Sequence, residues 1–474
     1  MEERLRIILL AAAVRLALAP FFMHAADLGT LYESSAMVLR GENVYDYVYG
    51  RTLELQGVTG LPVFFEGYAY HPLLVYFFVP FYWFFTLIAG SNPMMISTHN
   101  ASVPTLIYPW TLLLLLMLKV PIILADLVVV FLLARLDLGK AKIYAFCPYV
   151  VFVSAISGMT DGLVAAFLLA SYLTWKRNSF LSGILYGLSL LKIYTIILLP
   201  LYLVRLAGKP RVLAKFLVGF ALTILPVGYY FIISPDSIWN VLVNFQATRV
   251  MGGVNLYNFI WIISDLHFDI WISTIPNILL LAAVLVLVLT FGRKAPFLQS
   301  TLAIMLSFFL FGKVINEQFL VSIFPLILLC RECDGRLWVL PFAFSFLRPP
   351  PFAFYYFAIP IFSANSALYS YYLQVDVAWK EFAATGWLQI VMYALGVAFS
   401  LTILSNLLRI LKGDSVSVGP KRTATIPQHG FLLINSLSWS WKHLRAGFGF
   451  FADSPRKSMT WQKEEPPAWL QRQR

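Results

Sequence analysis

The sequence predicts an all-α protein that crosses a membrane many times, and its composition carries this prediction. Of the 474 residues, 60% are hydrophobic and only 12% are charged, whereas soluble domains are about 45–50% apolar and about 25% charged. The mean hydropathy of +0.77 agrees. So few charged side chains cannot cover a water-soluble globule, which excludes soluble enzymes, disordered regulators and disulfide scaffolds. At roughly 20 apolar residues per span, we expect about 10–13 transmembrane helices.

The net charge of +12 comes from basic residues that are scattered between hydrophobic runs. A nucleic-acid-binding protein gathers such residues on one solvated face, so we expect no nucleic-acid partner. In a membrane protein they concentrate in cytoplasmic loops. The first apolar run, residues 7–22, lacks a small-residue cleavage site, and we therefore expect it to be a retained first span and not a signal peptide.

Two kinds of loop alternate along residues 1–412, which we expect to form one transmembrane domain with a cytoplasmic N-terminus. Short basic loops belong in the cytoplasm by the positive-inside rule; they are 135–142, 176–177, 205–215, 293–294, 331–336 and 409–412. The other loops are poor in Lys and Arg for their length and are expected outside or in the lumen; they are 23–108, 157–161, 191–192, 234–257, 313–318 and 363–385.

Two apolar segments do not fit this alternation as simple spans. Segment 72–90 is apolar enough to span, but a span there would move the basic loop 135–142 to the outside. We therefore expect a re-entrant or interfacial helix pair, broken at Pro80, inside a large first outer loop; the alternative is a true span with inverted topology downstream. Segment 179–206 is expected to be two short spans that meet at Lys192.

The last residues, 413–474, have a different composition, with nine basic and four acidic residues. We expect a cytoplasmic tail whose segment 431–451 lies as a helix on anionic lipid, and a disordered tail is the alternative. The motif Cys330-Arg-Glu-Cys333 stands alone, and a structural zinc site needs two further ligands. We predict no metal site and no definite cofactor, although use of a divalent cation stays open. Asn100 begins a glycosylation sequon.

Polar residues gather at the outer ends of the predicted spans. Ionisable side chains at membrane depth are costly and usually functional. Their convergence at one face predicts a site there and not a pore across the bilayer. The candidate site residues are Asp27, Tyr70, His71, Asp161, Lys192, Arg249, Asn255, Lys313, Asn316, Glu317 and Gln318.

A carboxylate among several cations suits group transfer from a phosphate-linked donor. The cations would stabilise the charge that the leaving phosphate gains, and the carboxylate would take the proton of an attacking hydroxyl. The chain has neither a Gly-rich nucleotide loop nor a dinucleotide fingerprint. A lipid phosphate in the outer leaflet needs neither of them, and so it is the donor class that we expect.

A series of degenerate motifs runs over about residues 5–330. They are Asp27 after the first span, Leu39-Arg-Gly-Glu-Asn-Val-Tyr45, Tyr70-His-Pro-Leu-Leu74, Lys119-Val-Pro-Ile-Ile-Leu-Ala-Asp126, Gly158-Met-Thr-Asp161, Gly187-Leu-Ser-Leu-Leu-Lys-Ile-Tyr194 with Leu199-Pro200, and Lys313-Val-Ile-Asn-Glu-Gln-Phe319 with Pro325. In this order they resemble the GT-C superfamily of membrane glycosyltransferases. The nearest groups are the glycosylphosphatidylinositol mannosyltransferase I catalytic family and glycosyltransferase family 87.

The resemblance implies a GT-C-type fold and a polyprenyl- or dolichyl-phosphate sugar as donor, with mannose as the expected sugar. It implies a lipid or glycan acceptor, inversion at the anomeric carbon, and an acidic base in the first outer loop, which is Asp27 here. The plasma membrane of a prokaryote or the endoplasmic reticulum of a eukaryote would hold the protein, with its site facing outside or the lumen. Two departures stand out: Gly29 replaces the second Asp of the family's Asp-x-Asp, and Phe319 replaces a Tyr.

Other interpretations remain open at this point. The chain could be a transporter or flippase for a lipid-linked sugar, or a non-catalytic GT-C-like subunit of a membrane complex. Single residues also have structural interpretations: Asp27 as a helix cap, Lys192 as a snorkelling cation. Lys119 and Asp126 lie about two turns apart on one helix face, and we expect them to make structural contacts between spans.

Overall fold

The computed structural model describes residues 2–59, 67–90, 95–98, 101–104, 110–245, 252–254, 256, 270–347, 374, 378 and 386–413. The chain divides into two units, Met1–Asp414 and Ser415–Arg474. The predicted interfacial helix of the tail, 431–451, lies outside the described residues, which end at 413. So do the sequon at Asn100 and the candidate site residues Arg249 and Asn255.

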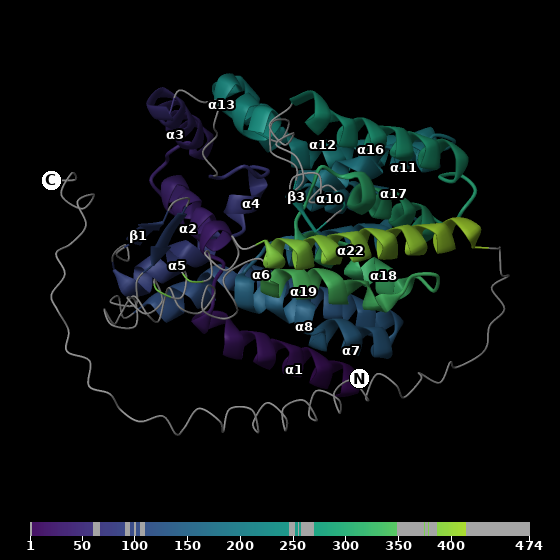
Figure 1. The fold of residues 1–474 in the computed structure, drawn as a ribbon, viewed down its shortest axis with the longest axis horizontal. Coiled ribbons are helices and arrows are strands. Elements are labelled where there is room, and N and C mark those ends of the chain that lie inside the picture. Colours follow the sequence, from purple (N-terminus) through teal and green to yellow (C-terminus); the bar gives the residue numbers. More distant parts are fainter. Residues whose placement is uncertain are drawn as a thin grey trace. The chain divides into compact units, whose positions relative to one another are not determined.

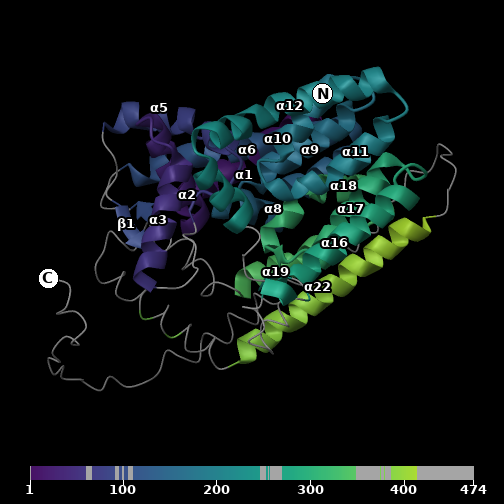
Figure 2. The same cartoon turned by 90° about the horizontal axis from the view of Figure 1, so that it is seen from above.

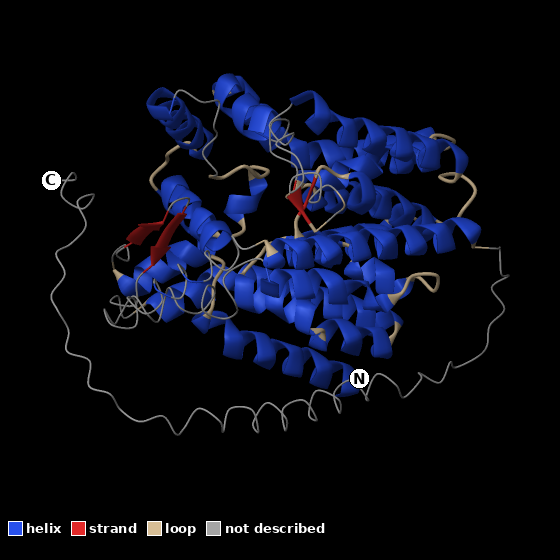
Figure 3. Ribbon diagram, in the orientation of Figure 1, coloured by secondary structure: helices blue, strands red, loops and turns tan. Residues whose placement is uncertain are grey.

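The described residues are mostly helical, which confirms the all-α prediction at that level (Figure 3). Two short strand pairs accompany the helices. Strands β1 (Met95–Thr98) and β2 (Ala101–Pro104) are antiparallel. Strands β3 (Gly252–Gly253) and β4 (Val314–Ile315) are parallel, which attaches the glycine pair to the polar segment that follows α17.

Three described helices are long and apolar enough to cross a membrane: α6 (Thr111–Leu136), α12 (Pro210–Ile233) and α22 (Trp387–Lys412) (Figure 2). A bent pair over residues 138–157, with a 50° break, passes the same test as one span. By this measure the expected 10–13 spans are not reached among the described residues. Prolines, glycines and polar residues interrupt the other apolar runs and leave helices of 10–17 residues.

The other helical segments are shorter. In chain order they are α1 (Glu2–Leu18), η1 (Ala19–Phe21), α2 (Ala25–Leu39), α3 (Val44–Thr59), α4 (Leu73–Tyr76), α5 (Val79–Ala89), α7 (Leu138–Phe146), α8 (Pro148–Val151), η2 (Phe152–Ser157), α9 (Asp161–Thr174), α10 (Ser179–Ser189), η3 (Ile193–Leu198), α11 (Leu199–Leu206), α13 (Pro235–Trp239), η4 (Asn240–Asn244), α16 (Ile270–Thr290), α17 (Phe297–Phe311), η6 (Glu317–Ser322), α18 (Phe324–Leu329), η7 (Gly335–Trp338) and α19 (Val339–Leu347).

The structure tests three predicted segment boundaries. The expected first span, 7–22, corresponds to α1 and η1, but α1 has only 17 residues with charges in its first and last turns and is not among the candidate spans. Segment 72–90 is indeed a helix pair, α4 and α5, with Pro80 in the first turn of α5. The helix also breaks at Lys192 as predicted, between α10 and η3.

A buried ion pair joins α1 to α6. The Nε of Arg15 lies 2.7 Å from Oδ2 of Asp126, and both side chains are fully buried. Tyr144 donates to the other carboxylate oxygen at 3.0 Å, and Arg15 also donates to the carbonyl of Ala145 at 2.9 Å. These bonds compensate the cost of burying the two charges. The structure therefore confirms a structural role for Asp126.

Helices α10 and α12 pack with their backbones in contact (Figure 1). A Cβ added to Gly183 would lie 2.1 Å from the carbonyl oxygen of Phe216, and one added to Gly219 would lie 2.2 Å from that of Phe180. Both distances are far below van der Waals contact, and the obstacle is backbone, which cannot turn away. The two glycines thus set the distance between these helices.

We expect Gly183→Ala to lower the free energy of unfolding by about 1–3 kcal/mol, because overpacking pushes α10 and α12 apart. Thermal unfolding of the detergent-solubilised protein measures this effect. Gly228→Ala is the matched control on α12, since a Cβ at Gly228 meets nothing within 4 Å. Equal melting temperatures for the two variants would contradict the close packing.

Candidate functional site at the start of helices α2 and α9

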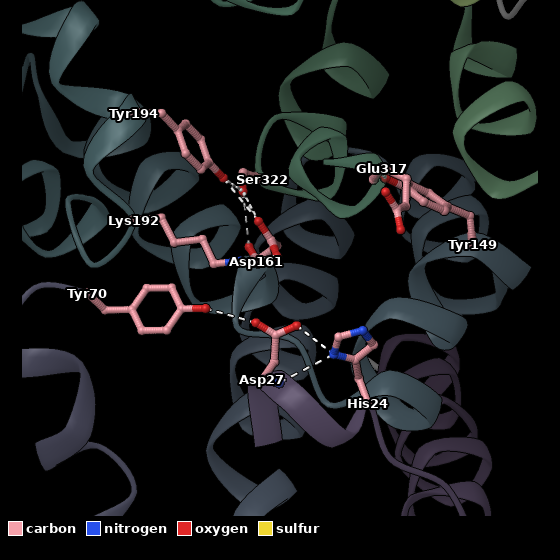
Figure 4. A network of polar contacts seen from close by, with 9 residues as sticks. All are labelled: His24, Asp27, Tyr70, Tyr149, Asp161, Lys192, Tyr194, Glu317 and Ser322. Atoms are coloured by element: carbon pink, nitrogen blue, oxygen red, sulfur yellow. Dashed lines mark hydrogen bonds and ion pairs between the residues drawn. The ribbon is translucent and has the colours of Figure 1, made fainter. Parts of the chain in front are cut away.

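Asp27 lies in the first turn of α2, where two side chains hold its carboxylate (Figure 4). The Nδ1 of His24 is 2.8 Å from Oδ2, and the hydroxyl of Tyr70 donates to Oδ1 at 2.8 Å. The Asp27 side chain remains 19% exposed. The sequence placed Asp27 and Tyr70 in one site, and the structure brings these two residues together.

The Nδ1 of His24 has two contacts with Asp27. It accepts the backbone N–H of Asp27 at 3.3 Å, and it lies 2.8 Å from Oδ2 of the same residue. Burial raises the pKa of Asp27, but the charge and hydrogen bond of His24, the charge of Lys192 and the Tyr70 hydroxyl outweigh burial and lower it overall. Asp27 is therefore ionised at neutral pH.

A second carboxylate, Asp161, begins α9 and is completely buried (Figure 4). The ammonium group of Lys192 donates to its Oδ2 at 2.6 Å. The hydroxyls of Tyr194 and Ser322 lie 3.1 and 3.3 Å from its Oδ1, and they also bond to each other. Two elements far apart in sequence, η3 with its N-cap Lys192 and η6, therefore converge on Asp161.

Local geometry explains how Asp161 and Lys192 reach each other. Gly158 has a φ of +76°, a left-handed conformation that ends η2 and turns the chain into α9. Lys192 has extended backbone angles in the break between α10 and η3. Its Nζ also lies 5.3 Å from the ring centre of Phe319, a cation–π contact. Phe319 thus takes a place beside the buried cation.

The polar segment after α17 lies partly inside the protein. Lys313, Glu317 and Gln318 are at least nine-tenths buried, whereas Asn316 is half-buried. The hydroxyl of Tyr149 donates to the carbonyl of Glu317, and both residues appear in the same close view as Asp161 (Figure 4). This segment therefore borders the site, and η6, which begins at Glu317, brings Ser322 to Asp161.

His71 is buried, and its two ring nitrogens differ. Nδ1 accepts the backbone N–H of Leu73 at 3.2 Å, so the proton of the neutral ring belongs on Nε2. Nε2 has no hydrogen-bond partner among the residues that the structure describes. Burial lowers the pKa of His71 to about 4. At neutral pH the His71 ring is then an uncharged N–H donor, and its part in the site stays a prediction.

No family model matches the chain, and no curated protein matches it. The site therefore has to be interpreted from its own geometry. No group of three or more His, Cys, Asp or Glu that could hold a metal occurs within the described part of the chain.

Sequence reasoning missed three residues that hold the carboxylates: His24, Tyr194 and Ser322. His24 stands three residues before Asp27, the spacing at which a capping side chain meets the first turn of a helix. Tyr194 stands two residues after Lys192 in the printed sequence. These spacings could have suggested both residues, whereas nothing near Ser322 in the sequence points to Asp161.

We expect Lys192→Met to lower the free energy of unfolding by about 3–5 kcal/mol, since it leaves a buried carboxylate without its counter-charge. The double variant Asp161→Asn/Lys192→Met removes both charges and should recover most of this loss. Thermal unfolding of the two variants checks the expectation. A double variant as unstable as the single one would show that the ion pair is not what Lys192 contributes.

His71 should make stability depend on pH in one direction. The unfolded chain binds the proton near pH 6.5 and the folded chain only near pH 4, so this contribution is complete above pH 6.5 and is lost as the pH falls toward 4. The expected loss is about 3 kcal/mol. The variant His71→Asn keeps an acceptor for the N–H of Leu73. Between pH 6.5 and pH 4, unfolding curves should show a smaller loss of stability for this variant than for the wild type.

Proposed function

We propose that this chain is an integral membrane glycosyltransferase of the GT-C type. It would transfer a sugar, with mannose favoured by the resemblance, from a polyprenyl- or dolichyl-phosphate donor to an acceptor hydroxyl at the outer or lumenal face. The observation that carries the proposal is the ionised and partly exposed carboxylate of Asp27, within the electrostatic influence of the buried Lys192. A base beside a cation is what transfer from a phosphate ester needs.

The reaction would proceed in one displacement. The acceptor oxygen forms a bond to the anomeric carbon while the bond from that carbon to the phosphate oxygen breaks, and the electron pair leaves with the phosphate. Asp27 takes the proton of the acceptor hydroxyl. Lys192, with Lys313 as a further buried cation, stabilises the negative charge that develops on the phosphate.

The low pKa of Asp27 in this state makes it a weak base, since catalytic bases work best near the operating pH. A bound phosphate would change this. Its negative charge would draw on the same two residues, His24 and Lys192, that lower the pKa of Asp27 now. The carboxylate would then hold a proton more readily when the donor is present, which couples the strength of the base to the arrival of its substrate.

The proposed location rests on the three long apolar helices α6, α12 and α22 and on the loop charges of the sequence. The positive-inside rule puts the basic loops in the cytoplasm and the first long loop, with Asp27, outside or in the lumen. The plasma membrane of a prokaryote or the endoplasmic reticulum of a eukaryote is then the compartment in which a lipid-linked donor would meet the site.

The test is sugar transfer from radiolabelled polyprenyl-phosphate mannose to native lipid acceptors by the detergent-solubilised protein. We expect Asp27→Asn to lower the rate by about 10²–10⁴-fold, the usual contribution of a general base. Glu42→Gln is the matched control, because Glu42 forms an exposed pair with Arg40 and should matter little. Full activity of Asp27→Asn would contradict the assignment of Asp27 as the base.

The double variant Asp161→Asn/Lys192→Met separates two roles of Lys192 in the same assay. If Lys192 binds the phosphate, the double variant should be folded but inactive. An active double variant would show that Lys192 has only a structural role. An inactive wild type, with the glucose and arabinose donors as well, would favour a transporter of lipid-linked sugar or a non-catalytic subunit over an enzyme.

A further inference from the structure

Lys119 lies inside α6 and is completely buried, and four backbone carbonyl oxygens surround its ammonium group. Nζ lies 2.9 Å from the oxygens of Ala19, Ala155 and Ile156, and it also contacts the oxygen of Phe22. Four acceptors around one nitrogen suit the ammonium form, which carries three N–H donors and no acceptor. The fourth carbonyl oxygen then has no N–H of its own and interacts with the positive charge of the ammonium group.

These four carbonyls belong to the ends of two helical segments. Ala19 begins the single turn of η1, which continues α1, and Phe22 is the C-cap of that turn. Ala155 and Ile156 lie in the last turn of η2. The last carbonyls of a helix have no partner within it and carry its partial negative charge. A single buried ammonium group therefore caps two helix ends at once.

The segments that carry the two carboxylates of the site begin just after these two capped helix ends. His24 and Asp27 follow η1 directly, and Asp161 follows η2 after the turn at Gly158. A backbone bond joins the same two segments, since His24 N–H donates to the carbonyl of Ser157 at 2.8 Å. The turn at Gly158 also packs on the Lys119 side chain, because a Cβ at Gly158 would lie 2.9 Å from Cε of Lys119.

We propose that Lys119 is a positioning residue of this site, which fixes the segment of Asp27 against the segment of Asp161 by clamping both helix ends. The proposal goes beyond the structural contact that the sequence suggested, and its catalytic consequence rests on the proposed function. Loss of the clamp lets the two carboxylates shift relative to each other while each keeps its own hydrogen-bond partners.

Hydrogen exchange tests the clamp without any assay of transfer. In Lys119→Met we expect faster amide exchange in peptides covering 19–27 and 152–162 together, with exchange in α10 and α12 unchanged. The matched control is Arg15→Met/Asp126→Asn, which removes the buried ion pair between α1 and α6 and should not accelerate both segments. If Lys119→Met does not fold, Lys119→Gln, which keeps two N–H donors, is measured instead.

The transfer assay tests the consequence. At a temperature where Lys119→Met remains folded, kcat should fall by about 10²-fold, the effect of a small misplacement of reacting groups, while KM for polyprenyl-phosphate mannose stays near the wild-type value. A purely structural role would leave kcat per folded molecule unchanged. Exchange that rises in only one segment, or everywhere equally, would overturn the clamp, whereas an inactive wild type would affect only the proposed function.

Discussion

The ammonium group of Lys192 and the carboxylate of Asp161 are both buried, and each is the counter-charge of the other. Taking one such charge from water without a partner costs several kcal/mol, so the fold has to bring them together. This requirement draws the start of α9 against the break after α10. The hydroxyls of Tyr194 and Ser322 then occupy the remaining acceptor positions of the carboxylate.

The two carboxylates of the site have different environments and therefore suit different tasks. Asp161 is fully buried and its oxygens are occupied by a cation and two hydroxyls. Asp27 is partly exposed, and its partners His24 and Tyr70 are side chains that a ligand could replace. Where the environments of two acids diverge in this way, one commonly organises the site while the other reacts.

The sequence was a good guide to helices and their interruptions, and a poorer one to contacts. Apolar runs with Pro80 and Lys192 inside them predicted the breaks of the structure, because backbone restriction and a buried charge act locally. Among the described residues three helices, or four with the bent pair, are long enough to span, since each interruption shortens a helix, and the count of 10–13 spans stays a prediction. The neutral state of His71 depends on burial by distant segments, and Ser322 meets Asp161 across 161 positions, which no local pattern encodes.

The close packing of α10 and α12 at Gly183 and Gly219 also limits how much of the site can move. With no layer of side chains between them, α10 and α12 have little room to slide or rotate against each other and behave as one rigid body. Lys192 follows directly after α10 and is anchored to that body. Because the Lys119 clamp would hold the start of α2 against the start of α9, Asp27 and Lys192 would both stand in place before a ligand arrives, and a ligand would have to fit the site as it is.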